Sequence, residues 1–114
     1  MKKIKKPWGY EVLVEKNKKY ILKKLFMKKN HRCSLQYHRK KTETIFVLKG
    51  KLKIFYGKSE KNLKSKIFNP QQTITILPKI IHRMQALVDT TYLECSSPEF
   101  YDVVRLSDDY KRKS

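Results

Sequence analysis

Four side chains in this sequence have the types and spacing of a metal site. Gln36 and His38 lie two residues apart, so in an extended strand both would point to the same face. Glu43 could return to that face from the start of the next strand, and His82, which follows the turn at Pro78, could come from a neighbouring strand. Two imidazoles, one carboxylate and one amide oxygen suit a divalent Fe, Mn, Ni or Zn ion. The pattern therefore predicts a metal centre, although an interior held by histidine hydrogen bonds without an ion would leave the same pattern.

The elements that would position these side chains are short β-strands. Residues 51–54 and 73–77 alternate between polar and apolar types, as expected of strands with one buried face. Further β-prone runs of strand length occur at residues 20–22, 25–27, 44–48, 92–95 and 101–104. Turn residues separate these runs about every ten positions, which predicts an all-β sandwich or barrel. We expect residues 58–66, which are polar and lysine-rich, to form a surface loop or an irregular link.

Length and composition indicate one small domain. The chain has 114 residues, 39% of them hydrophobic, and we expect a single domain 1–114 with its core at residues 6–110 and a frayed tail at 111–114. Cys33 and Cys95 are too few for a disulfide framework, and we expect both to be small buried fillers. No secretory leader is evident, and the longest apolar run, residues 45–48, is far shorter than the roughly 20 residues of a membrane-spanning helix. These features predict a cytoplasmic protein without a membrane span.

The charge of the chain is strongly positive. There are 28 basic and 10 acidic residues, giving a formal net charge of +18. Such a field attracts phosphate groups of many kinds and identifies no single partner. Lysines provide 23 of the basic residues, whereas nucleic-acid readers depend on the bidentate guanidinium of arginine. We therefore interpret the charge as a solvated lysine surface and do not expect nucleic acid as a partner.

The segments around the candidate ligands resemble the two histidine motifs of the cupin superfamily. The first segment occupies residues 30–50 and holds Gln36, His38 and Glu43, and the second ends at His82. More narrowly, the chain is similar to the C-terminal cupin domain of type II mannose-6-phosphate isomerases. Four signatures carry this similarity: Lys-Pro-Trp-Gly-Tyr-Glu at residues 6–11, Ser-Leu-Gln-Tyr-His at 34–38, Ile-His-Arg at 81–83 and Asp-Val-Val-Arg-Leu-Ser-Asp-Asp-Tyr at 102–110. The resemblance implies a double-stranded β-helix, or jelly roll.

For function, the resemblance implies a metal-dependent isomerase that interconverts mannose 6-phosphate and fructose 6-phosphate. Gln36, His38, Glu43 and His82 would be the metal ligands, and the ion would act as a Lewis acid on an enediolate. Asn30 stands where the first motif usually has glycine and tolerates left-handed backbone, so we expect the fold to survive there.

Other roles that the resemblance implies fall on charged residues near the motifs. Glu94 would carry a proton between two carbons, and Lys41, Arg83 or Arg105 would hold the phosphate. An outward-facing Glu94 fits the sequence equally well, and Arg105 could instead anchor the C-terminal segment. Lys41 replaces a family arginine, which keeps the charge but loses bidentate geometry. Lys79 stands where the second motif has a glycine, so we expect the backbone of that turn to differ.

Cupins share one barrel among many activities, so two other functions stay open. One is a non-enzymatic, metal-containing module that binds or senses a sugar. The other is an epimerase-like cupin for nucleotide sugars, a class that relies on a His–Tyr pair without metal. The expected partner is a small anionic sugar, either a sugar phosphate or a nucleotide sugar. Barrels of this class often pair through exposed strand edges, which predicts a homodimer.

Overall fold

The structure is a computed structural model that describes residues 2–112. Almost all regular structure in these residues is β-strand. The elements follow one another as β1 (Lys2–Lys6), β2 (Gly9–Lys16), β3 (Ile21–Met27), β4 (Leu35–His38), β5 (Glu43–Lys49), β6 (Leu52–Gly57), the 3-10 helix η1 (Glu60–Asn62), β7 (Lys64–Phe68), β8 (Thr73–Ile76), β9 (Ile81–Ala86), β10 (Thr90–Ser96) and β11 (Val103–Ser107). In this part of the chain, no helix has the length and apolar character needed to cross a membrane.

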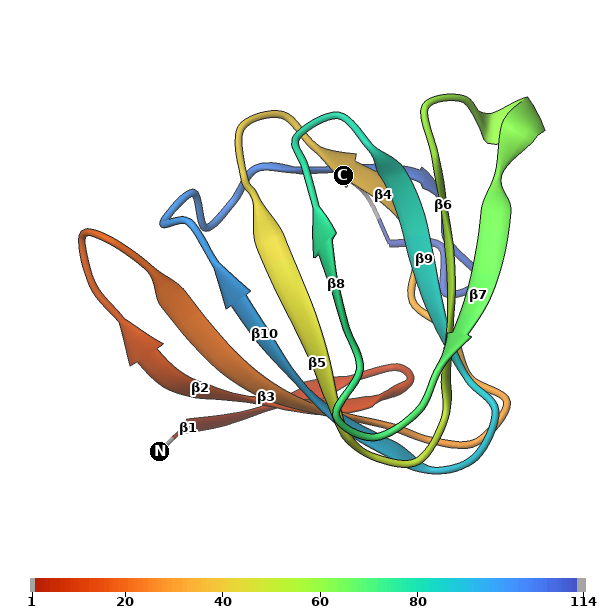
Figure 1. Cartoon of the computed structure of the whole chain (residues 1–114). Helices are drawn as coiled ribbons and strands as arrows, with labels where there is room; N and C mark the ends of the chain where they lie inside the picture. Colours follow the sequence, from red (N-terminus) through yellow and green to blue (C-terminus); the bar gives the residue numbers. More distant parts are fainter. Residues whose placement is uncertain (1, 113–114) are drawn as a thin grey trace.

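The strands form two antiparallel sheets that face each other (Figure 1). Across the described residues, one sheet has the order β1-β2-β3-β10-β5-β8 and the other has the order β11-β4-β9-β6-β7. The chain crosses repeatedly between them, so that β4 and β5, which are consecutive in the sequence, lie in different sheets. This arrangement is the jelly roll, and it confirms the prediction of a single all-β domain.

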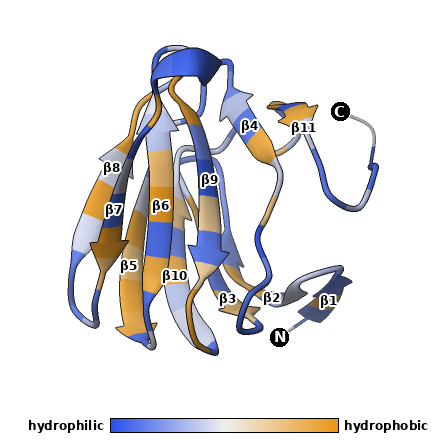
Figure 2. Cartoon of the chain, turned by 90° about the vertical axis from the view of Figure 1, so that its right-hand side faces the viewer, coloured by the Kyte–Doolittle hydropathy of each residue, from blue (hydrophilic) through white to orange (hydrophobic). Residues whose placement is uncertain are grey.

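The alternation of residue types in the strands builds the core between the sheets. Leu52 and Ile54 of β6 are fully buried, with Lys53 on the opposite face between them. Figure 2 shows hydrophobic and hydrophilic bands alternating along this strand. Ile45 and Val47 of β5 are buried in the same way from the other sheet. The predicted strands at residues 44–48 and 51–54 are therefore confirmed, and they place apolar side chains on the inside.

The segments at residues 64–68 and 101–107 differ from the expectations. Lys64–Phe68 is strand β7, paired with β6, and not part of a loop. Its residues are exposed except Phe68, so no hydrophobic alternation marked it in the sequence. The final strand is Val103–Ser107 and not residues 101–104. Tyr101 precedes it with 90% of its surface exposed, because the chain turns there before it pairs with β4.

One of the two cysteines differs from the predictions, and the C-terminal segment makes an ion pair. Cys33 is buried as expected, but Cys95 is exposed because it lies on the opposite face of β10 from Ser96. In the segment that was expected to fray, Nε of Arg112 lies 2.9 Å from a carboxylate oxygen of Asp108. Residues 113–114 lie outside the described part of the chain.

The turn before His82 keeps a left-handed backbone without a glycine. Lys79 has a φ of 69°, and the N–H of Ile80 donates to the carbonyl of Leu77 at 3.3 Å to close the turn. Lys79 thus adopts the conformation in which glycine is usual, contrary to the expectation of a different backbone. Its own N–H donates to the carbonyl of His38 at 2.7 Å. The turn therefore connects the strand of one histidine to the strand of the other.

We expect Lys79→Gly to stabilise the protein by about 0.5–1 kcal/mol. A left-handed φ costs a residue with a Cβ about 1–2 kcal/mol, and the greater freedom of glycine in the unfolded chain offsets only part of this. Urea unfolding measures the change. The matched control is Lys66→Gly in the extended strand β7, which should lose about 0.5–1 kcal/mol. Equal losses in both variants would contradict the argument.

Asn30, with a φ of 68°, confirms that the first motif tolerates asparagine at its glycine position.

Candidate metal centre

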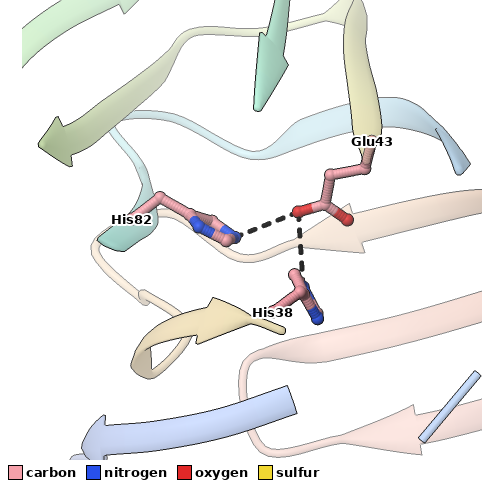
Figure 3. A group of neighbouring side chains, drawn as sticks. All are labelled: His38, Glu43 and His82. Carbon is pink, nitrogen blue, oxygen red and sulfur yellow. Dashed lines mark ion pairs between the residues drawn. The ribbon is translucent and has the colours of Figure 1, made fainter. Parts of the chain in front are cut away.

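Three of the four predicted ligands meet between the sheets. His38 is the last residue of β4, Glu43 is the first of β5, and His82 is the second of β9. Since β4 and β9 belong to one sheet and β5 to the other, the histidines face the glutamate across the interior. Figure 3 shows both imidazoles directed at the Glu43 carboxylate.

The three side chains form a compact and buried group. Nε2 of His82 lies 3.0 Å from Oε1 of Glu43, and Nε2 of His38 lies 3.6 Å from the same oxygen. One ligand atom from each residue lies within 4.8 Å of the other two. The exposed fractions are 0% for His82, 2% for Glu43 and 7% for His38. Three atoms that can coordinate a metal ion are therefore gathered where water has little access.

The backbone sets which ring nitrogen of neutral His82 carries the proton, and this tautomer suits a metal ligand. Its Nδ1 lies 2.9 Å from the carbonyl oxygen of Ile80, and because a carbonyl only accepts, this nitrogen carries the proton. In the neutral ring, Nε2 then presents a lone pair toward Glu43. Among the described residues, neither this nitrogen nor Oε1 of Glu43 has a hydrogen bond of good geometry. Two buried acceptors that face each other are satisfied by a cation between them, so the cluster could bind a metal ion.

Gln36, the fourth predicted ligand, lies beside this cluster. It is opposite His82 in the register of β4 and β9, and it lines the same cavity. Its Oε1 accepts a hydrogen bond from the hydroxyl of Ser34 at 3.3 Å. The strand geometry thus agrees with the expectation that Gln36 and His38 share a face, while coordination by the amide stays a prediction.

The cluster borders a cavity of about 570 Å³ between the sheets. The charged residues that line it are Lys6, Lys23, Lys41, Arg105, Arg112, Glu11, Glu43 and Glu94. Lys6 and Lys23 pair with the carboxylate of Glu11 at 3.3 and 3.2 Å. Lys41, which is buried, and Arg105, which is half-buried, add further positive charge to the wall. The cavity therefore attracts anions.

The structure separates the residues that were predicted to contact substrate into two groups. Glu94, Lys41 and Arg105 all line the cavity, so the inward-facing interpretation of Glu94 is the one that the structure has. Arg83 lies elsewhere: its Nε donates to the carbonyl of Cys33 at 2.9 Å, and it borders a separate pocket of about 90 Å³. Arg83 follows His82 in β9, and neighbouring residues of a strand point to opposite faces.

The two glutamates of the cavity differ in their affinity for protons. Burial alone would raise the pKa of Glu43, but the hydrogen bonds and positive charge that the imidazoles of His38 and His82 supply when protonated hold it well below its ordinary value. Burial, followed by the negative charge of Glu43, raises the pKa of Glu94 to about 8, although nearby lysines oppose this shift. Glu43 is thus a carboxylate ready to bind a cation, and Glu94 can exchange a proton near neutral pH.

We expect the raised pKa of Glu94 to weaken the metal-free fold as the pH rises. Between about pH 4.5 and about pH 8 the folded chain keeps a proton that the unfolded chain has lost, so the free energy of unfolding falls with pH across this window. Glu94→Gln removes this penalty. The free energy of unfolding of this variant, measured relative to that of the unaltered chain, should therefore be higher at pH 8 than at pH 5 by on the order of 3 kcal/mol. Urea unfolding in a chelator at both pH values measures the gain, with the exposed Glu60→Gln as control. Equal changes for Glu94→Gln at both pH values would refute the expectation.

Among the cavity residues that sequence reasoning did not identify are Tyr92 and Arg112. Tyr92 is fully buried and lines the cavity, and its hydroxyl has no hydrogen-bond partner among the described residues. Its position two residues before Glu94 on one strand was the available signal. Arg112 lines the cavity from the segment that was expected to fray. The signal there was Asp108, four residues earlier, which binds the guanidinium.

The family described as the mannose-6-phosphate isomerase C-terminal domain matches residues 1–108. The chain belongs to this family. No curated protein sequence matches this cupin. The predicted family is therefore confirmed over nearly the whole chain, including the segments that carry His38, Glu43 and His82.

Solved structures confirm the cupin fold. The capsular polysaccharide assembling protein CapF from Staphylococcus aureus superposes with a TM-score of 0.83 at 14% identity, covering 92% of this cupin and 31% of CapF. KdgF from a Halomonas species gives 0.78 at 12% identity, with 89% of each chain covered. An RmlC-like cupin from Shewanella frigidimarina gives 0.75 at 11% identity, with 88% of this cupin and 86% of that chain covered. This cupin spans about a third of the length of CapF. At such identities the likeness shows the fold alone.

Proposed function

We propose that this cupin is a metal-dependent sugar-phosphate isomerase that interconverts mannose 6-phosphate and fructose 6-phosphate. The observation that carries the proposal is the convergence of His38, Glu43 and His82 beside a cavity with basic walls. Membership of the isomerase domain family supports the choice of reaction and substrate. A bound divalent ion would serve as a Lewis acid for the sugar oxygens.

The basic residues of the cavity would bind the phosphate. Lys41 is only 4% exposed, and a buried ammonium group requires an anionic or hydrogen-bonding partner. Arg105 lies on the neighbouring strand β11, opposite Gln36 in the register with β4, and lines the same cavity. These two side chains would orient the sugar so that its carbonyl end faces the metal ligands.

Glu94 would move the proton. Isomerisation transfers one proton from C2 of the aldose to C1 and another from the oxygen on C2 to the oxygen on C1, through an enediol. A carboxyl group with a pKa of about 8 can both accept and return a proton near neutral pH. Glu94 lines the cavity that holds the metal ligands, so we assign it the transfer between the two carbons.

The test is isomerisation by the purified chain in deuterated water. After removal of metals with a chelator, the chain is supplied separately with Fe²⁺, Mn²⁺, Co²⁺, Ni²⁺ or Zn²⁺ and incubated with mannose 6-phosphate. We expect formation of fructose 6-phosphate and uptake of deuterium at C1, both dependent on the added ion. Substrate binding without turnover for every ion would overturn the isomerase and favour the sugar-binding module. Turnover that is unaffected by the chelator would overturn the dependence on a metal ion.

We further propose that this cupin acts as a homodimer in the cytoplasm.

A further inference from the structure

We propose that Asp102 is a positioning residue of the candidate metal centre. Its carboxylate accepts three hydrogen bonds from consecutive backbone N–H groups. Oδ1 accepts from Arg39 at 2.7 Å, and Oδ2 accepts from Lys40 at 2.9 Å and from Lys41 at 2.7 Å. These donors and the acceptor are more than 60 residues apart in the sequence. The interaction therefore joins two distant segments at one point.

The three N–H groups belong to the loop that separates two of the metal ligands. His38 ends β4 and Glu43 begins β5, so residues 39–42 are all that connects them. The remaining loop residue, Thr42, donates its N–H to the hydroxyl of Ser97 at 3.0 Å and accepts from the N–H of Ser97 at 3.0 Å. Every backbone N–H of the loop is thus held by residues 97–102. The distance and direction between His38 and Glu43 depend on this loop because it crosses from one sheet to the other.

A carboxylate is the group that this geometry requires. Three N–H donors converge on two oxygens, and the negative charge strengthens each hydrogen bond. An asparagine would offer one acceptor oxygen, and its NH₂ would point at N–H groups that also need acceptors. Such a mismatch loosens the loop without removing any atom that faces the metal ligands.

The same contact places cavity residues relative to the metal ligands. Lys41 is one of the three donors and lines the cavity. Phe100, Tyr101, Val103 and Arg105 line it from both sides of Asp102. Asp102 therefore fixes the loop at residues 39–42 relative to residues 100–105, which form part of the cavity wall. This inference rests on the proposed metal site but not on the identity of the sugar.

The test compares the Co²⁺ complexes of three full-length chains. Co²⁺ reports both affinity and ligand geometry through its visible absorption. We expect Asp102→Asn to bind Co²⁺ about 10–100-fold more weakly than the unaltered chain and with an altered spectrum, the usual scale for residues that orient metal ligands. The matched control is Asp89→Asn. Asp89 also joins distant loops by accepting from a backbone N–H, that of Lys29 at 2.8 Å, but Lys29 lies outside the loop that separates His38 from Glu43. This control should bind within twofold of the unaltered chain with an unchanged spectrum.

The outcomes separate this inference from the proposed function. If the unaltered chain binds Co²⁺ and Asp102→Asn matches it in affinity and spectrum, the positioning role is overturned while the metal site stands. Absence of Co²⁺ binding by the unaltered chain would overturn both. An equal weakening in Asp89→Asn would show a general loss of stability and also overturn the role of Asp102. Should Asp102→Asn fail to fold, Asp102→Glu keeps both oxygens but shifts them by one methylene. We expect it to bind at least threefold more weakly, and an unchanged affinity and spectrum would again overturn the proposal.

Discussion

Replacement of Glu43 by glutamine is expected to reduce isomerisation about 1,000-fold or more. The carboxylate is the negative member of the cluster, and its oxygen lies within 3.6 Å of both imidazoles. Glutamine has the same shape but carries no charge, so it would bind a divalent ion far more weakly. Loss of the Lewis acid removes several kcal/mol of transition-state stabilisation, which corresponds to the expected factor. Initial rates at a metal concentration that just saturates the unaltered chain, together with direct Co²⁺ titration, measure the two effects.

The control for this variant is the same chemical change at an exposed position. Glu60 lies in η1 on the surface, and Glu60→Gln should keep its activity and metal affinity. Retention of metal binding by Glu43→Gln within a few-fold of the unaltered chain would show that Glu43 is not a ligand. The group of three residues would then be a hydrogen-bonded interior, the other interpretation that the sequence allowed.

Replacement of Glu94 by glutamine is expected to separate chemistry from metal binding. A general acid or base contributes about 100–10,000-fold to a rate, so kcat should fall by a factor in this range. Glu94 is not a member of the ligand cluster, so Co²⁺ affinity should stay within a few-fold of the unaltered chain. The KM for mannose 6-phosphate should change little because the phosphate contacts remain. Deuterium uptake at C1 should fall together with kcat.

A second outcome would reassign the proton carrier. If Glu94→Gln keeps kcat within tenfold, Glu94 serves only to shape the cavity. Tyr92, whose buried hydroxyl lines the same cavity, would be the next residue to test, by Tyr92→Phe. A loss in this variant without any dependence on metal would favour the epimerase-like function.

The parts of the fold with one buried face could be predicted from the sequence. Residues 44–48 and 51–54 show their burial through alternation, because one side of each strand faces the core. Strand β7 could not be predicted in this way, since it lies at a sheet edge with four of its five residues exposed. Its position is set by backbone hydrogen bonds to β6. Such bonds form whatever the side chains are, so they leave no pattern in the sequence.

The candidate site followed from the sequence only where chemistry and spacing acted together. His38, Glu43 and His82 were identifiable because their residue types suit a divalent ion and their spacing matched a family motif. Arg83 was misplaced because the motif gave its neighbourhood but not its direction, which depends on the alternation set by His82. Asp102 stood out in the sequence only as part of a motif, because a carboxylate that accepts backbone N–H groups leaves no pattern in the residues that donate them.

The turn between β8 and β9 has a consequence for how this domain can diverge among descendants. The N–H of Lys79 binds the carbonyl of His38, and His82 follows only three residues later. An insertion or deletion between Leu77 and His82 would therefore shift both histidines at once, and their imidazoles would no longer converge on Glu43. The connection between β6 and β7, which is exposed and lies outside the cavity, carries no such constraint. Lineages can lengthen or shorten that connection freely, while the short turn must keep its length for as long as the two imidazoles serve one ion.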